Sequence, residues 1–189
     1  MISVSAVRQI LVKHPVIPAI RDKKNLRRLP QGTPRCVFLL ESSLIDIAHT
    51  SAEVSQAGHV TFIHVDLVEG LKVDHAGLRW LMDNVKPHGI ISTHRGALDN
   101  AKKLGLLRIL RVFMLDSEAV EKGKALAAAL GPDFVEVLPG VAVPIFSDAI
   151  LDGFRSPLIA GGLVADHREV HAILSRGVCG VSTSKSTLW

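Results

Sequence analysis

The sequence contains no tyrosine, and its 189 residues include only six Phe and two Trp. Proteins that bind single-stranded nucleic acid by base stacking use aromatic side chains as platforms, so the composition disfavours this class. Cysteine is also scarce. Cys36 and Cys179 are too few for a disulfide scaffold or a cysteine-rich zinc site, and we expect both to be core thiols.

Long apolar runs and targeting signals are missing as well. No apolar run reaches the roughly 18 residues of a membrane span, and the opening segment MISVSAVRQILVKHP lacks the three regions of a secretory signal peptide. Hydrophobic residues make up 48% and charged residues 21%, a balance that excludes a disordered chain. We expect one domain, residues 1–189, in a cytoplasmic protein without membrane contact.

Basic residues are concentrated near the N-terminus. Residues 1–35 contain eight Lys or Arg and one acid, Asp22, a charge of +7; the remaining 14 basic and 17 acidic residues contribute −3, which gives the total of +4. A basic end on a mildly acidic body is typical of proteins that bind polyanions. A solvated basic surface without a partner explains the same pattern.

Eight short apolar runs predict strands, and most of the segments between them have helical periodicity. The runs cover 16–20, 37–40, 61–65, 89–91, 110–115, 134–138, 158–160 and 179–181, and the clearest helical segments are 43–56, 75–85, 118–130 and 166–176. This alternation favours a compact (β/α)₈ TIM-type barrel with truncated first and last helices over an open doubly wound sheet. The amphipathic segment 3–14 could fill the floor of the barrel.

A phosphate site is predicted after the last two strands. In parallel barrels the loops at the carboxyl ends of the strands form the site, and phosphate often binds after strands 7 and 8. Glycines let backbone N–H groups approach an anion, and hydroxyls add donors. The alternative is that these residues make only tight turns and a helix cap. The predicted phosphate ligands are Gly161, Gly162, Ser182 and Thr183.

Carboxylates follow or lie within four other predicted strands. Such acceptor groups could hold ligand hydroxyls or a divalent cation, although any of them could instead pair with Arg21, Arg95 or Arg111. His64 lies in the middle of a predicted strand and faces the same side as Asp66, so it could contact a ligand, but we expect a hydrogen-bonded interior residue. The carboxylates predicted to bind a small polyol phosphate are Asp22, Glu41, Asp66 and Glu136.

The sequence resembles the glycerol-3-phosphate responsive antiterminator family, also called glycerol uptake operon antiterminator regulatory proteins. The resemblance runs from about His14 to Trp189 and depends on segments that occur in the family's order. They are HPVIPAIRD, VFLLESSL, FIHVDLVEGL, GIISTHRGALDNAKKLGL, LRVFMLDS, PDFVEVLPG, IAGGL and VSTSKSTLW.

The resemblance implies a barrel that binds glycerol 3-phosphate without converting it, and a ligand-bound protein that acts on leader mRNA of glycerol-utilisation genes. We expect no catalytic residue, metal or cofactor, although the sequence leaves open whether a cation joins the carboxylates. The phosphate and glycerol would then occupy the two groups of residues above. The family has a lysine where this chain has His94, which could change the pH dependence of binding, and Arg95 could substitute. The residues expected to meet RNA are Lys23, Lys24, Arg27 and Arg28.

Two other hypotheses stay open. One is an enzyme acting on a small phosphorylated polyol or sugar, with Glu136 or Asp66 as base and His64 or His94 as acid. No lysine lies in or directly after a predicted strand, which disfavours a Schiff-base aldolase. The other is a metabolite-binding module with a protein partner. Homo-oligomerisation is left open by the sequence.

Overall fold

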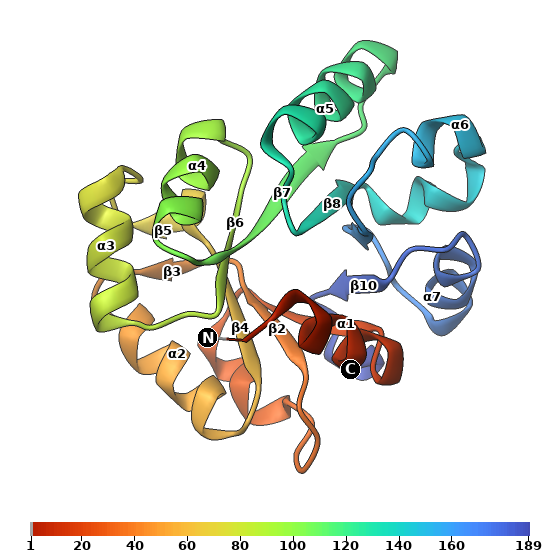
Figure 1. Ribbon diagram of the computed structural model, residues 1–189. Coiled ribbons are helices and arrows are strands. Elements are labelled where there is room, and N and C mark those ends of the chain that lie inside the picture. The colour runs from red at the N-terminus through yellow and green to blue at the C-terminus, as the bar shows by residue number, and fades with distance from the viewer. Residues whose placement is uncertain (1) are drawn as a thin grey trace.

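The computed structural model describes residues 2–189 and shows a closed parallel barrel of eight strands (Figure 1). Around the barrel the order is β1-β10-β9-β8-β7-β6-β4-β2, and every pairing is parallel, so the predicted fold is confirmed. The strands are β1 (Val16–Ile20), β2 (Cys36–Leu39), β4 (Val60–His64), β6 (Gly89–Ser92), β7 (Leu107–Phe113), β8 (Phe134–Leu138), β9 (Leu158–Gly161) and β10 (Gly180–Thr183).

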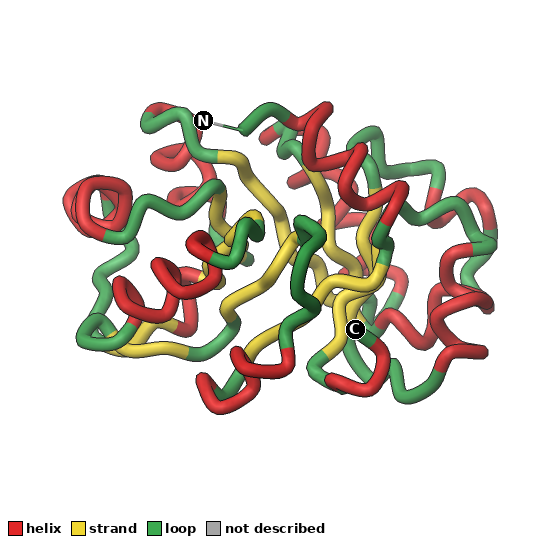
Figure 2. The backbone as a smooth tube through the Cα atoms, turned by 90° about the horizontal axis from the view of Figure 1, so that it is seen from below, coloured by secondary structure: helices red, strands yellow, loops and turns green. Residues whose placement is uncertain are grey.

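Helices surround the strands, which run through the middle of the molecule when it is seen from below the view of Figure 1 (Figure 2). The α-helices are α1 (Val4–Lys13), α2 (Ile47–Gln56), α3 (His75–Asn84), α4 (Arg95–Lys103), α5 (Ser117–Leu130), α6 (Asp148–Leu151) and α7 (His167–Leu174). The 3₁₀ helices are η1 (Lys23–Arg28), η2 (Val65–Leu67), η3 (Gly140–Ile145) and η4 (Ser186–Leu188). As predicted, the first and last helices of the barrel, η1 and η4, are truncated.

Local sequence signals fix the helix ends. Asp116 caps α5 by accepting a hydrogen bond from the Ala119 N–H at 2.7 Å, and Gly131 ends that helix in the left-handed conformation with φ +51°. At α7, Asp166 and Glu169 form a reciprocal capping box. These signals set where α5 and α7 begin and where α5 ends, and the parallel pairing of the strands puts their carboxyl ends at one face of the barrel.

The core has an outer layer between strands and helices and an inner layer within the barrel. Phe38 and Phe62 belong to the inner layer, where their rings meet edge to face at 5.8 Å between centroids. Val7 and Leu11 of α1 are each 1% exposed and join this inner cluster with residues at the amino ends of the strands. Helix α1 therefore closes the floor, as the amphipathic pattern predicted, and the opposite end is the mouth.

Two predicted boundaries were wrong for identifiable reasons. Strand β7 begins three residues earlier than predicted because Arg108, which interrupts the apolar run, is buried by donating to the carbonyls of Leu130 and Gly131. Helix α2 begins four residues later than predicted because Ser43 belongs to β3 (Ser42–Ser43), which pairs with β5 (Val68–Glu69). No helix within residues 2–189 is long and apolar enough to cross a membrane.

Candidate functional site

A cavity of about 590 Å³ opens at the mouth of the barrel, which we call the mouth cavity. Its walls come from β1, β7, β8, the carboxyl end of β10 and the loops after β9 and β10, so it lies where ligand sites of parallel barrels form. The charged side chains that line it are Arg21, Arg111 and Glu136, and the hydroxyl residues are Ser182, Thr183 and Ser184. No lysine lies among the described residues that line it.

A buried ion pair lies at the base of this cavity. Arg111 Nε donates to Glu136 Oε2 at 2.8 Å, and Ser182 Oγ donates to Glu136 Oε1 at 2.6 Å. The side chain of Glu136 is fully buried and that of Arg111 is 7% exposed. Such a pair is stable only while both charges are compensated. The Nη1 and Nη2 atoms of Arg111 have no acceptor in residues 2–189, so they are free to donate to a ligand.

The loop after β9 lines the same cavity and contains backbone donors without partners. Gly162 and Leu163 both line the cavity and both have positive φ, +89° and +62°. Across the described chain, the N–H groups of Gly162, Leu163 and Ser184 have no hydrogen-bond acceptor. A Cβ at Gly161 would clash with Ser182 Oγ, so only glycine fits there. The arrangement suits an anion.

The predicted phosphate residues are brought together, although their hydroxyls are occupied. Gly162, Ser182 and Thr183 line the mouth cavity, and Gly161 lies directly behind it. Ser182 Oγ is committed to Glu136, and Thr183 Oγ1 donates to the Val164 carbonyl at 3.1 Å. The free donors at these loops are therefore backbone N–H groups and the hydroxyl of Ser184, which has no hydrogen-bond partner in residues 2–189.

The four predicted glycerol-binding carboxylates do not converge. Only Glu136 lines the mouth cavity. Asp22 and Glu41 line a neighbouring cavity of about 450 Å³, the outer cavity, and Glu41 forms an ion pair with Arg21, which lines both cavities. Asp66 lines neither, because local donors occupy its carboxylate. It accepts from Ser92 Oγ at 2.6 Å and from the N–H and hydroxyl of Thr93 at 2.8 and 2.9 Å.

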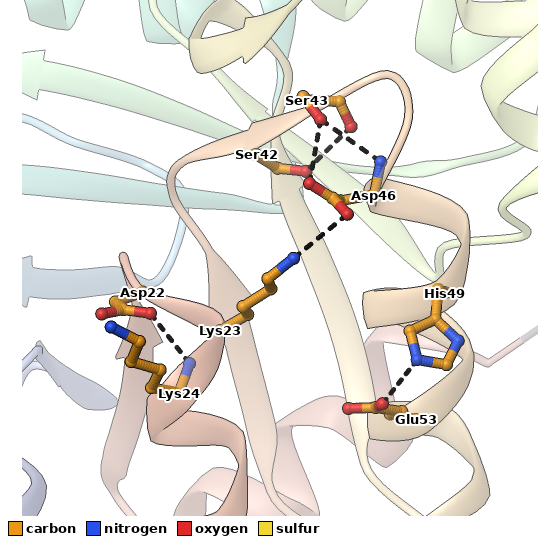
Figure 3. Close-up of polar contacts among 8 residues, drawn as sticks. All are labelled: Asp22, Lys23, Lys24, Ser42, Ser43, Asp46, His49 and Glu53. Carbon is orange, nitrogen blue, oxygen red and sulfur yellow. Dashed lines mark hydrogen bonds and ion pairs between the residues drawn. The ribbon is translucent and has the colours of Figure 1, made fainter.

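Figure 3 shows the polar contacts beside the outer cavity. Asp22 caps η1 by accepting from the Lys24 N–H at 2.9 Å, and Lys23 Nζ reaches Asp46 Oδ1 at 3.2 Å. All four predicted RNA-binding side chains on η1 are exposed. In the described structure Lys24 and Arg27 form no ion pair, and Arg28 Nη1 donates to Ser186 Oγ at 2.8 Å.

The structure confirms the interior position expected for His64 but not the expected hydrogen bond at its Nδ1 atom. This residue ends β4 and is 3% exposed, and its Nδ1 atom has no hydrogen-bond partner in residues 2–189. Burial, followed by the positive charge of Arg111, lowers the pKa of His64 to about 4. His94 is exposed at the start of α4 and lines neither cavity, and Arg95 pairs with Asp99.

Sequence reasoning missed several parts of the mouth. Arg111 was considered only as a partner for a carboxylate, although an arginine inside the apolar run LRILRVF signals a buried polar role. Phe113, which is 48% exposed at the rim, offers the aromatic face that the composition did not suggest. The free backbone N–H groups of Leu163 and Ser184 could not be predicted from the residue types at these positions. Within residues 2–189, no cluster of three or more His, Cys, Asp or Glu is arranged to hold a metal ion.

Comparison with known proteins gives a consistent result. The family model for the glycerol-3-phosphate responsive antiterminator matches residues 16–189. The uncharacterized protein YgcP of Escherichia coli K12 is 31% identical over 180 residues, which cover 95% of this chain and 94% of YgcP.

Two crystal structures resemble the whole barrel. One is a glycerol uptake operon antiterminator regulatory protein from Listeria monocytogenes, 32% identical, with a TM-score of 0.84 over 93% of this chain and 95% of the other. The second is a glycerol uptake operon antiterminator-related protein from Thermotoga maritima, 32% identical, with a TM-score of 0.81 over 92% and 96%. Because the family model matches residues 16–189 and the chain folds as the same eight-stranded barrel as these two structures, this chain belongs to the glycerol-3-phosphate responsive antiterminator family.

Proposed function

We propose that this protein binds glycerol 3-phosphate unchanged in the mouth cavity, and that the ligand-bound form acts on leader mRNA of glycerol-utilisation genes to prevent premature termination. Family membership supports a regulator that responds to this ligand. The proposal adds the site, the absence of conversion and the RNA partner. It includes neither a metal ion nor a cofactor.

One observation carries the ligand part: Gly162, Leu163 and Ser184, whose backbone N–H groups have no acceptor, line the same cavity as Arg111, whose Nη atoms are free. The phosphate would accept from the N–H groups of Gly162, Leu163 and Ser184, because such groups bind anions without needing a charged side chain. The glycerol hydroxyls would then face Arg111 and Glu136, which offer donors and an acceptor at the base of the cavity.

The same geometry favours binding over conversion. Glu136 is paired with Arg111 and accepts from Ser182, so it is poorly placed to take a proton from a substrate. The residues that line the mouth cavity include no lysine for a Schiff base and no histidine for acid catalysis. The proposed RNA contacts are the cations of η1, with Phe113 available to stack on an unpaired base at the rim.

Calorimetric titration tests the ligand part, using glycerol 3-phosphate, glycerol and inorganic phosphate in separate runs, with and without EDTA. Analysis of the recovered ligand follows. We expect binding of glycerol 3-phosphate alone, unaffected by EDTA and without conversion. Arg111→Gln should abolish this binding, whereas Arg79→Gln, which removes an exposed arginine of α3, should not. Conversion of the ligand, or equal binding by both variants, would refute the proposed site.

A further inference from the structure

We propose that η1 and η4 form one RNA-contact surface, here called the η1–η4 surface, and that the chain between β10 and η4 couples it to the mouth cavity. The cations of this surface are Lys24, Arg27, Arg28 and Lys185. The proposal rests on the proposed function, which it extends by adding a residue, Lys185, and a route by which the ligand controls RNA binding.

The first support is the distribution of free cations. Of the four basic residues on η1, Lys23 alone forms an ion pair, whereas Lys24, Arg27 and Arg28 form none within residues 2–189. In residues 36–189, nine of 14 basic residues form ion pairs. Unpaired cations keep their charge available to a partner instead of neutralising it within the fold. Figure 3 shows the contrast on η1, where Lys23 reaches Asp46 but the ammonium of Lys24 has no partner drawn.

The second support is that the fold joins η1 to the C-terminal segment. Arg28 Nη1 donates to Ser186 Oγ at 2.8 Å, a contact between residues 158 positions apart. Lys185 directly precedes η4, is exposed, and forms no ion pair with any residue of the described chain. The contact therefore brings a fourth free cation to the three on η1, which the linear sequence could not show.

The third support is that the chain leading into η4 also lines the mouth cavity. Ser184 lines the mouth cavity and its N–H group is one of the free donors. The next residue, Lys185, donates its N–H to Thr183 Oγ1 at 3.1 Å, and Trp189 Nε1 donates to the Thr183 carbonyl at 2.9 Å. A ligand held by Ser184 would thus fix the backbone at Lys185, and Ser186 would pass this restraint to Arg28.

The surface fits RNA better than a protein partner. Its exposed side chains on η1 and η4 are all polar or charged, because the leucines of these helices are at least partly buried. Stable protein interfaces have an apolar centre, whereas phosphate contacts need only cations and hydrogen-bond donors. An acidic protein partner is therefore the outcome to be excluded.

Fluorescence anisotropy with labelled poly(U) RNA, over a range of salt concentrations and with or without glycerol 3-phosphate, tests the surface. The double variant Lys24→Gln/Lys185→Gln should bind about tenfold more weakly, and its log–log salt slope should fall by about 1.4, because each phosphate contact on a single strand contributes about 0.7. The control Lys102→Gln/Lys103→Gln removes two exposed, unpaired cations of α4 and should bind as the wild type does. Equal binding by both double variants would overturn the surface.

Ser186→Ala tests the coupling, because it removes the acceptor of Arg28 and leaves every cation in place. We expect it to bind glycerol 3-phosphate normally by calorimetry while the ligand no longer strengthens poly(U) binding. A ligand effect equal to that of the wild type would refute the route. Binding of poly-glutamate but not poly(U) would overturn the RNA partner. If the wild type does not bind glycerol 3-phosphate at all, the proposed function is refuted. This result differs from a failure of the η1–η4 surface, in which the ligand still binds.

Discussion

Replacing Arg111 by methionine is the sharpest test of the mouth's architecture. The substitution keeps the volume of the side-chain stem and removes the only cation within residues 2–189 that pairs with Glu136. Glu136 is fully buried and, among the described residues, would keep only the hydrogen bond from Ser182. Leaving a buried charge uncompensated costs about 3–5 kcal/mol of folding free energy. For a chain of 189 residues this corresponds to a fall in Tm of about 6–20 °C.

A second substitution separates the charge from the packing. In Arg111→Met/Glu136→Gln the amide can still accept from Ser182, and no buried charge remains. Urea unfolding should place this double variant within about 2 kcal/mol of the wild type, with a large coupling energy between the two sites. It should nevertheless fail to bind glycerol 3-phosphate, because the free donors of Arg111 are gone. If the double variant is no more stable than Arg111→Met, the buried pair is not what the single substitution breaks.

Three further outcomes are expected. Folding lowers the pKa of His64 from 6.5 to about 4, so the free energy of unfolding should be highest above pH 6.5 and should fall by up to about 3 kcal/mol as the pH drops toward 4. His64→Asn should flatten the profile of Tm against pH over this range. Gly161→Ala should lose ligand binding through the clash with Ser182 Oγ, while Gly96→Ala, with open space around the new methyl group, should not; calorimetry compares them. Leu11→Ala should destabilise the barrel by about 2–5 kcal/mol in urea unfolding, and a smaller loss would mean that α1 does not seal the floor.

The barrel could be predicted because its strands are buried on both faces and therefore leave near-continuous apolar runs. The exceptions occur where local structure overrides that pattern. Arg108 lies inside β7 because two carbonyls at the end of α5 accept its guanidinium hydrogens, and no periodicity encodes that contact. The β3 strand is similarly hidden, because its two serines pair with a segment 26 positions away along the chain.

The site could be predicted only in part. Loops after parallel strands meet at one end, so the grouping of Gly162, Ser182 and Thr183 followed from strand order alone. The contacts of each carboxylate could not be predicted in this way. Asp22 is taken by a helix cap and Asp66 by neighbouring hydroxyl and backbone donors, and both outcomes depend on side-chain directions that a sequence does not give.

The α1 helix has a consequence for the timing of regulation. Because Val7 and Leu11 fill the floor, a molecule in the barrel can enter and leave only through the mouth. The η1–η4 surface borders that single exit, since Ser184 lines the cavity and Lys185 follows it. An RNA bound there would slow the escape of the ligand that recruited it. The complex would then retain its signal for as long as the RNA stays bound, even after the surrounding concentration of ligand has fallen.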